Sequence, residues 1–177
     1  MPFIGRAIES VLTEISNMFP ILFLTGPRQV GKKTVLQQLA QKDRRYVALD
    51  TPSDRAFAKS DPELFIQRYA PPVVIDEVQY APELFDYIKV YVDIHKNNGD
   101  FWLTGSQTFH LMKNVTESLE GRAGIVRMLG LSNNEIDATG FGPFQVVPEK
   151  LFGRMEHAVR LSFRHWALRV SCTCQFI

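Results

Sequence analysis

The stretch Leu24–Ala40, "LTGPRQVGKKTVLQQLA", decides the fold of this 177-residue chain. It follows the short apolar run "FPILF" and places Gly26 and then Gly31-Lys32 at the spacing G-x-x-x-x-G-K. Glycines at this spacing let the backbone turn closely around a phosphate group, provided that a strand precedes the loop and a helix follows it. The next position, which carries Ser or Thr in this motif, is Lys33 here.

The residues around the loop supply that context. "ILFLT" is typical of a buried strand, and apolar residues at helical spacing predict a helix that begins near Gly31 and an earlier one over about Phe3 to Met18. Further strands are expected in "RRYVALD", "PPVVIDE", "DFWLTGS" and "GIVRMLGL", and further helices in 62–70, 82–95 and 108–121. Because strands alternate with helices, the pattern predicts an α/β fold with a parallel sheet covered on both faces.

Composition and charge narrow the class of protein. With 45% apolar and 22% charged residues, the chain can bury a core and is not expected to be disordered. A net charge of +1 provides no long-range field that would attract nucleic acid or an anionic membrane. Arg6, Glu9 and Glu14 interrupt the apolar N-terminal positions, so we expect neither a transmembrane span nor a cleaved signal, and a cytoplasmic location. Cys172 and Cys174 fit neither a disulfide framework nor a four-ligand zinc site.

The alternating pattern fades after residue 132. We therefore expect an N-terminal helix (1–18), a nucleotide-binding core (19–132) and a tail (133–177). The tail has a basic bias that would suit a nucleic-acid contact, but a solvated helix face is the interpretation that we prefer, since no aromatic stacking platform accompanies it. Its basic residues are Lys150, Arg154, Arg160, Arg164 and Arg169.

Two groups of residues carry the expected chemistry. Backbone N–H groups at the start of a helix bind phosphate oxygens, and Lys32 would add a positive charge at the β- and γ-phosphates. Asp76 ends an apolar strand, where it could hold Mg²⁺ directly or through water, and Glu77 could polarise an attacking water as general base. The expected phosphate-binding residues are Gly26, Pro27, Arg28, Gln29, Val30, Gly31, Lys32, Lys33 and Thr34.

Four segments, "LTGPRQVGKKTVL", "SDPELF", "VVIDEVQYAPELF" and "WLTGSQTFHLMKNVTESLEGR", together resemble the prokaryotic AAA-type ATPase domain (AAA_14), usually found ahead of a DUF4143 region. They cover most of 19–127, in matching order and spacing. The resemblance implies a P-loop NTPase fold, with an AAA+-like three-layer α/β/α core and a five-stranded parallel sheet of order 5-1-4-3-2. It also implies ATP as ligand, Mg²⁺ as cofactor and ATP hydrolysis as the reaction.

The resemblance assigns two further roles. Ser106, in "LTGSQ", is similar to a sensor residue that contacts the γ-phosphate, and Gln107 is the adjacent candidate. Arg122, in "LEGR", resembles an arginine that completes a site, in the same chain or in a neighbouring subunit, so self-association through Arg122 is a candidate interaction.

The chain departs from the family in two respects. Where members read "GKTT", Lys33 replaces the hydroxyl that ligates Mg²⁺, and an ammonium cannot ligate a cation. Thr34 is a poor substitute, because one helical residue further on the side chain points about 100° away. We therefore expect phosphate binding to survive and metal-assisted hydrolysis to suffer. The second departure is length, from which we expect a truncated or frame-shifted C-terminal region that diverges near Ser162.

Three functions remain open on the sequence. The leading one is an ATP-binding, ATP-hydrolysing AAA-type domain. The alternative is a non-hydrolysing module, either a nucleotide-dependent interaction protein or a DNA-associated one, whose nucleotide site is mainly structural. A small-molecule kinase is disfavoured, because no acceptor-binding lid is evident and Glu77 suits water activation better.

Overall fold

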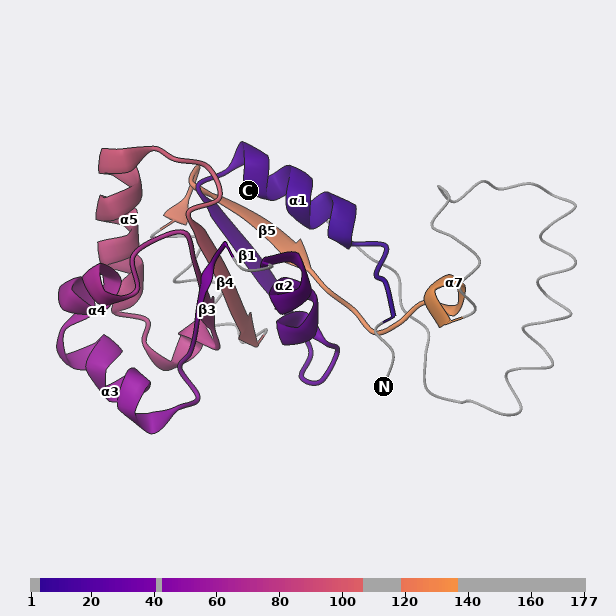
Figure 1. Cartoon of the computed structure of the whole chain (residues 1–177), viewed down its shortest axis with the longest axis horizontal. Coiled ribbons are helices and arrows are strands. Elements are labelled where there is room, and N and C mark those ends of the chain that lie inside the picture. Colours follow the sequence, from indigo (N-terminus) through magenta and orange to yellow (C-terminus); the bar gives the residue numbers. More distant parts are fainter. Residues whose placement is uncertain (1–3, 41–42, 107–118, 137–177) are drawn as a thin grey trace, which may run out of the picture.

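The computed structural model describes residues 4–40, 43–106 and 119–136, which contain a five-stranded parallel sheet (Figure 1). The strands lie in the order β2-β3-β4-β1-β5, and every pairing is parallel. This confirms the predicted order 5-1-4-3-2. The strands are β1 (Ile21–Gly26), β2 (Arg45–Ala48), β3 (Val73–Asp76), β4 (Phe101–Ser106) and β5 (Ala123–Arg127).

Helices cover both faces of the sheet, which makes three layers (Figure 1). On one side lie α1 (Glu9–Met18) and α2 (Lys32–Ala40). On the other lie α3 (Pro52–Ser60), α4 (Pro62–Arg68) and α5 (Leu84–His95). A 3₁₀ turn (Val78–Tyr80) follows β3, and the short α7 (Asn133–Ile136) follows β5.

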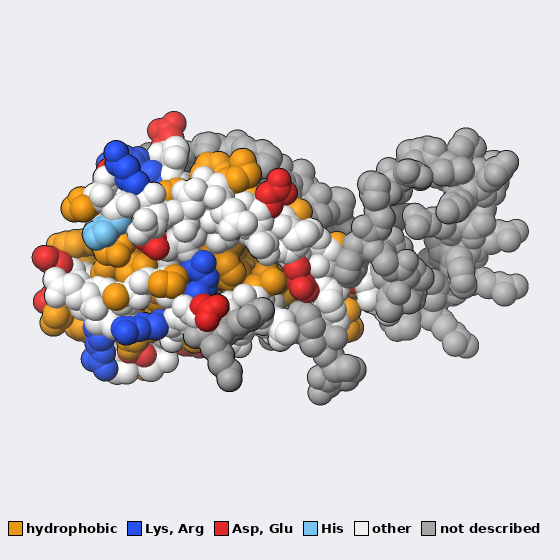
Figure 2. Space-filling model, turned by 45° about the horizontal axis from the view of Figure 1, so that its top comes forward, with side chains coloured by type: hydrophobic (Ala, Val, Ile, Leu, Met, Phe, Trp, Pro, Cys, Tyr) orange, Lys and Arg blue, Asp and Glu red, His pale blue; other side chains and the backbone are white. Residues whose placement is uncertain are grey.

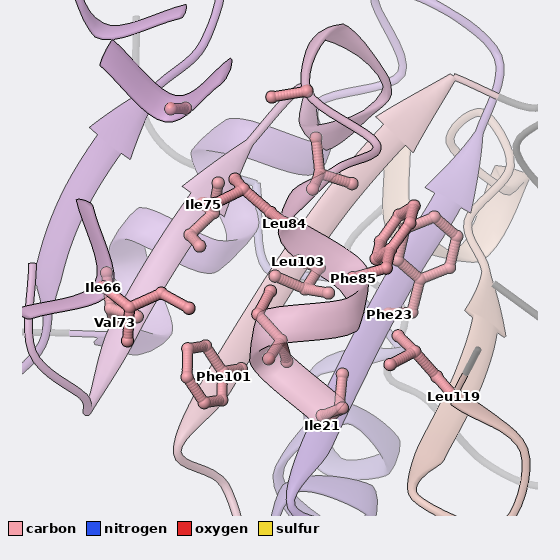
Figure 3. Close-up of a cluster of buried hydrophobic side chains, with 14 of the residues drawn as sticks. Ile21, Phe23, Ile66, Val73, Ile75, Leu84, Phe85, Phe101, Leu103 and Leu119 are labelled. Atoms are coloured by element: carbon pink, nitrogen blue, oxygen red, sulfur yellow. The ribbon is translucent and has the colours of Figure 1, made fainter. Parts of the chain in front are cut away.

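Alternate residues of the central strands enter two separate cores. Ile21 and Phe23 of β1 pack toward α3, α4 and α5, a cluster that Figure 3 shows from the side of α5. Leu22 and Leu24 of the same strand pack toward α1 and α2. All four side chains are 0% exposed. The unbroken apolar run "ILFL" is therefore the expected signature of a parallel strand buried on both faces.

The predicted helix starts were right in two cases. Asp61 caps α4 by accepting a hydrogen bond from the backbone N–H of Leu64 at 2.9 Å, with Pro62 in the first turn. The helix α2 begins at Lys32, next to the predicted Gly31.

Other boundaries differ from the prediction. Helix α1 begins at Glu9 rather than near Phe3, because Arg6 turns its side chain toward the loop after β1 and its backbone N–H toward the Glu9 carboxylate, at 2.6 Å. The polar stretch after β2 is helix α3, whose single buried residue, Ala58, gives too weak a periodicity to predict a helix. The start of the expected tail contains α7. The helix expected at 108–121 and the tail from residue 137 lie almost entirely outside the described residues, as do Gln107 and both cysteines.

The described surface carries mixed charge. Figure 2 shows basic and acidic side chains interspersed with hydrophobic ones on the visible face, rather than one extended basic area. This agrees with the net charge of +1. Across the ranges that the structure describes, no helix is both long and apolar enough to span a membrane.

Gly26, the last residue of β1, packs closely against the backbone of Met128. Gly26 has φ +148°, and a Cβ placed on it would lie 2.1 Å from the backbone carbonyl oxygen of Met128. We expect Gly26→Ala to lower the free energy of unfolding by about 3 kcal/mol or more, because backbone cannot move aside cheaply. In the control Gly121→Ala, at φ +71° with open space around the Cβ, only backbone strain of about 1–2 kcal/mol is expected. Urea denaturation measures both, and equal losses would contradict the close approach.

Candidate nucleotide site

The loop between β1 and α2 has the backbone conformation of an anion cradle. Gly31, just before α2, has φ +93°, and Gln29 inside the loop has φ +63°. Left-handed residues before a helix are typical of loops whose successive N–H groups bind an anion. The predicted strand, glycine loop and helix are therefore all present.

Lys32 points back into the loop. Its side chain is buried, 6% exposed, and its Nζ donates hydrogen bonds to the carbonyl oxygens of Gly26 and Pro27, at 2.9 and 2.8 Å. Burial lowers the pKa of the Lys32 ammonium, an effect that the nearby charges of Glu77 and Asp76 oppose. The one buried cation of the loop therefore faces the acidic pair at the end of β3.

Asp76, the last residue of β3, is also buried, at 6% exposed. Its Oδ1 accepts a hydrogen bond from the Thr104 hydroxyl of β4, and its Oδ2 accepts one from the Tyr46 hydroxyl of β2, at 2.5 Å. Burial, followed by the hydrogen bond to Asp76, raises the pKa of Tyr46 above its ordinary value. Each carboxylate oxygen of Asp76 is thus already engaged by a protein hydroxyl.

Glu77 follows with a left-handed backbone, φ +58° and ψ +45°. Its backbone N–H donates to Oγ1 of Thr104, at 3.1 Å, and its carboxylate accepts a hydrogen bond from the side-chain amide of Gln79. The amide oxygen of Gln79 in turn accepts from the backbone N–H of Ser106, at 3.3 Å. A non-glycine residue in this conformation is uncommon, and such strain concentrates at functional positions.

Lys33 lies on the outer side of α2. It is exposed, and its Nζ lies 5.2 Å from the ring centroid of Tyr46, in cation–π geometry. Thr34, the next residue along the chain, is exposed as well. The ammonium of Lys33 therefore lies beside the same tyrosine that is hydrogen-bonded to Asp76.

The donors present do not form a protein cage for a divalent cation. Among residues 4–40, 43–106 and 119–136, no group of three or more His, Cys, Asp or Glu side chains could hold a metal ion. Asp76 has hydroxyl partners on both oxygens, and Lys33 stands in the place of the expected hydroxyl ligand. A nucleotide-bound Mg²⁺ needs only one or two carboxylates beside phosphate oxygens and water, so Asp76 stays the candidate contact for such an ion.

The structure brings Ser106 to this site but not Arg122. Ser106 pairs in register with Gly26, so the end of β4 lies beside the loop. Arg122 precedes β5, and its carbonyl accepts the N–H of Ile21 at the start of β1, at the opposite edge of the sheet. Its guanidinium binds both carboxylate oxygens of Asp93, at 2.6 and 3.0 Å. Arg122 therefore lies away from the loop of its own chain, and its role in completing a site, in the same chain or in a neighbouring subunit, stays a prediction.

A buried ion pair supports the loop from its other side, and sequence reasoning missed it. Arg6, 7% exposed, donates to the Val30 carbonyl at 3.0 Å and to the Leu129 carbonyl at 2.8 Å. Its Nε contacts Oε1 of Glu135 at 3.0 Å. The N-terminal segment, the loop and the segment after β5 are thus joined by one guanidinium. Its only sequence signal is an arginine among apolar helix-like positions, which by itself does not identify a partner.

An apolar groove of about 640 Å³ lies elsewhere, between α4 and α5, and is lined by residues such as Ile66, Tyr87, Val90 and Ile94. None of its lining residues belongs to the loop or to the acidic pair. The nucleotide site is therefore defined by its backbone conformation and charges, not by the size of this groove.

The sheet order, the glycine loop with its buried lysine and the acidic pair at the end of β3 together define a P-loop NTPase domain. The profile of the family described as AAA domain matches residues 18–137, and the chain belongs to that family.

Sequence relatives share part of their length with this chain. It is 34% identical over 122 residues to the uncharacterized protein Rv2008c of Mycobacterium tuberculosis and, equally, to Mb2031c of Mycobacterium bovis. The match covers 68% of this chain and 27% of each relative, so the chain spans about a quarter of their length.

Solved structures give weaker likenesses. A DNA replication initiation factor matches with a TM-score of 0.45 at 12% identity, over 88% of this chain and 60% of its own. Pif1 helicase from Bacteroides, in complex with ADP-AlF3 and ssDNA, matches with a TM-score of 0.43 at 12% identity, over 96% and 59%.

The ion pair that supports the loop yields a stability prediction. Removing the Glu135 charge leaves the buried Arg6 guanidinium without its counter-ion, so we expect Glu135→Gln to lower the free energy of unfolding by about 3–5 kcal/mol at pH 7. Glu63→Gln, at an exposed site on α4, is the control and should change it little.

The same pair should respond to pH. Burial by itself would raise the pKa of Glu135, but hydrogen bonds from Ser132, Ala7 and Arg6 outweigh it and lower the pKa. The ionised carboxylate therefore stabilises the fold fully above its unfolded pKa, about 4.3, and this contribution is lost as pH falls through the lower folded pKa. Denaturation between pH 7 and 3 should show a smaller acid-induced loss for Glu135→Gln than for the parent. Identical pH profiles would contradict the assignment.

Proposed function

We propose that this domain binds ATP in the loop from Gly26 to Thr34, with Lys32 contacting the terminal phosphates. The observation that carries the proposal is the buried Lys32 ammonium inside a glycine loop, facing Asp76 and Glu77. Membership of the AAA domain family supports nucleotide binding as the general function.

Lys32 is placed to exchange partners when nucleotide binds. Without nucleotide its ammonium is hydrogen-bonded to the carbonyl oxygens of Gly26 and Pro27. Phosphate oxygens carry a full negative charge, so their hydrogen bonds to the ammonium are shorter and stronger than those of carbonyls. The N-terminal end of α2 adds favourable potential for the same anion. Binding therefore replaces two neutral acceptors by charged ones.

Slow ATP hydrolysis is the activity that we propose for the acidic pair. Glu77 would accept the proton of an attacking water, and Ser106, beside the loop at the end of β4, would contact the γ-phosphate. Asp76, at the end of β3, is the residue that we propose to hold Mg²⁺ directly or through water. A divalent cation supplies charge neutralisation at the phosphates, and the poor donor set predicts that this help is weak here.

The alternative is a domain that binds nucleotide without hydrolysing it and presents an interaction surface to another protein or to DNA. The replacement of a hydroxyl by Lys33 favours this alternative, because its ammonium supplies positive charge near the phosphates but no ligand for a metal. Binding is common to both functions, so turnover separates them.

Four expectations from the sequence remain proposals. These are a core domain over 19–132, a cytoplasmic location, self-association in which Arg122 contacts a neighbouring site, and the start of a DUF4143-associated region after residue 132. The greater length of the mycobacterial relatives is compatible with a further region. Arg122 would have to release Asp93 before it could act on a neighbour.

ATP binding is tested by removing the ammonium of Lys32. We expect Lys32→Met, which keeps the length of the side chain, to weaken ATP binding by about 1.5–3 kcal/mol, the range for a charged hydrogen bond. Lys59→Met, an exposed position on α3, is the control and should bind as the parent does. Isothermal titration calorimetry measures all three proteins, with circular dichroism to confirm folding. Equal ATP affinities would overturn the proposal.

The metal requirement is tested at Lys33. A hydroxyl can ligate the cation and an ammonium cannot, so we expect the parent to bind ATP almost equally well with Mg²⁺ or with EDTA and to hydrolyse it slowly. Lys33→Thr should make binding Mg²⁺-dependent and raise turnover, while Lys33→Met removes the charge without adding a ligand and should do neither. If Mg²⁺ strengthens binding to the parent as much as to Lys33→Thr, with equal turnover, Lys33 does not stand in the metal's place.

A further inference from the structure

One side-chain amide connects the ends of two neighbouring strands at the site. The Nε2 group of Gln79 donates to a carboxylate oxygen of Glu77, just after β3, and Oε1 of Gln79 accepts from the backbone N–H of Ser106, at the end of β4. The donor faces a carboxylate, which can only accept, and the acceptor faces an N–H, which can only donate, so the orientation of the amide is fixed by its two partners.

The backbone of Glu77 is held by Thr104, whereas the direction of its carboxylate is set by the hydrogen bond from Gln79. Thr104 fixes the start of the turn, because its Oγ1 accepts from the N–H of Glu77 and donates to Asp76. Thr104 is 0% exposed, so this anchor is rigid. The glutamate side chain extends beyond the anchor, and its carboxylate accepts a hydrogen bond from Gln79. An amide that is tied to both Glu77 and Ser106 couples the direction of the carboxylate to the position of the β4 end.

We propose that Gln79 is a positioning residue that transmits occupancy of the terminal-phosphate position at Ser106 to the carboxylate of Glu77. The inference rests on the proposed function and adds to it the means by which a triphosphate is distinguished from a diphosphate. A phosphate at Ser106 competes with Oε1 of Gln79 for the N–H of Ser106, and a shift of the amide then turns the carboxylate that its other end holds.

Gln79 itself exchanges no proton in the reaction. When water attacks, its oxygen forms a bond to the γ-phosphorus, the bond to the β–γ bridging oxygen breaks, and the released proton passes to the Glu77 carboxylate. Gln79 keeps its amide hydrogens and sets only where that carboxylate points. Its loss should therefore lower the rate of the chemical step without weakening ATP binding, because a competitor for the N–H of Ser106 is removed.

The first test separates rate from affinity. We expect Gln79→Met, of similar length but without the amide, to lower single-turnover hydrolysis about 10- to 100-fold, as expected when a reacting group is misplaced, with ATP affinity no weaker than that of the parent. Gln67→Met, at an exposed position of α4, is the matched control and should retain both values. The measurement is made in the parent and in the Lys33→Thr background, and Glu77→Gln is the reference for loss of the base.

The second test does not depend on turnover. In spectra of ¹⁵N-labelled protein, the side-chain amide signal missing from Gln79→Met identifies Gln79, and Glu77→Gln should shift that signal. A non-hydrolysable ATP analogue should shift it as well, and ADP should shift it much less, because only the triphosphate reaches Ser106.

The outcomes distinguish the inference from the proposed function. If Glu77→Gln loses turnover while Gln79→Met retains it, or if ADP and the triphosphate analogue shift the Gln79 signal equally, the inference is overturned and the function stands. If Glu77→Gln itself retains the turnover of the parent, the role of Glu77 fails. If neither the parent nor the Lys33→Thr protein hydrolyses ATP, the response of the Gln79 amide signal to the two nucleotides decides whether the inference holds.

Discussion

The position of β4 between β1 and β3 is the constraint on which the site depends. In a parallel sheet all carboxyl ends meet at one edge, so the phosphate loop after β1 and the acidic pair after β3 are brought to that edge with one strand between them. That intervening strand supplies Thr104, which holds Asp76 and the backbone of Glu77, and Ser106, which contacts Gln79. The acidic pair therefore takes its geometry from a strand that it does not belong to.

Lys32 and Lys33 are consecutive residues but differ in burial, because one step along a helix turns the side chain by about 100°. Lys32 is buried and folds back into the loop, whereas Lys33, turned by about 100° around α2, is exposed beside Tyr46. Lys32 is hydrogen-bonded to two loop carbonyls, whereas the ammonium of Lys33 lies over the ring of Tyr46. The second charge is the physical reason to expect nucleotide affinity without strong metal dependence.

The parts of the site that the sequence predicted are local ones. Gly26, Gly31 and Lys32 lie within a few residues of each other in the sequence. The run "VVIDE" likewise predicts, from five consecutive residues, a buried strand that ends in carboxylates. Partners brought from a distance were not predictable: Tyr46 is 30 residues from Asp76, and Arg6 is 129 residues from Glu135. For Arg122 the sequence predicted a role near a site, but the residue comes just before β5. It therefore lies at the end of the sheet opposite to the loop.

By itself, the sequence determined the alternation of strands and helices, because periodicity and glycine spacing are properties of short segments. Through its family resemblance it also predicted the strand order that the structure has. Only the tertiary structure decided which side chains surround the acidic pair, since hydrogen-bond partners depend on which strands become neighbours. Thr104 and Gln79 are ordinary polar residues in the printed sequence. They become parts of the site because β3 and β4 pair in parallel and end together.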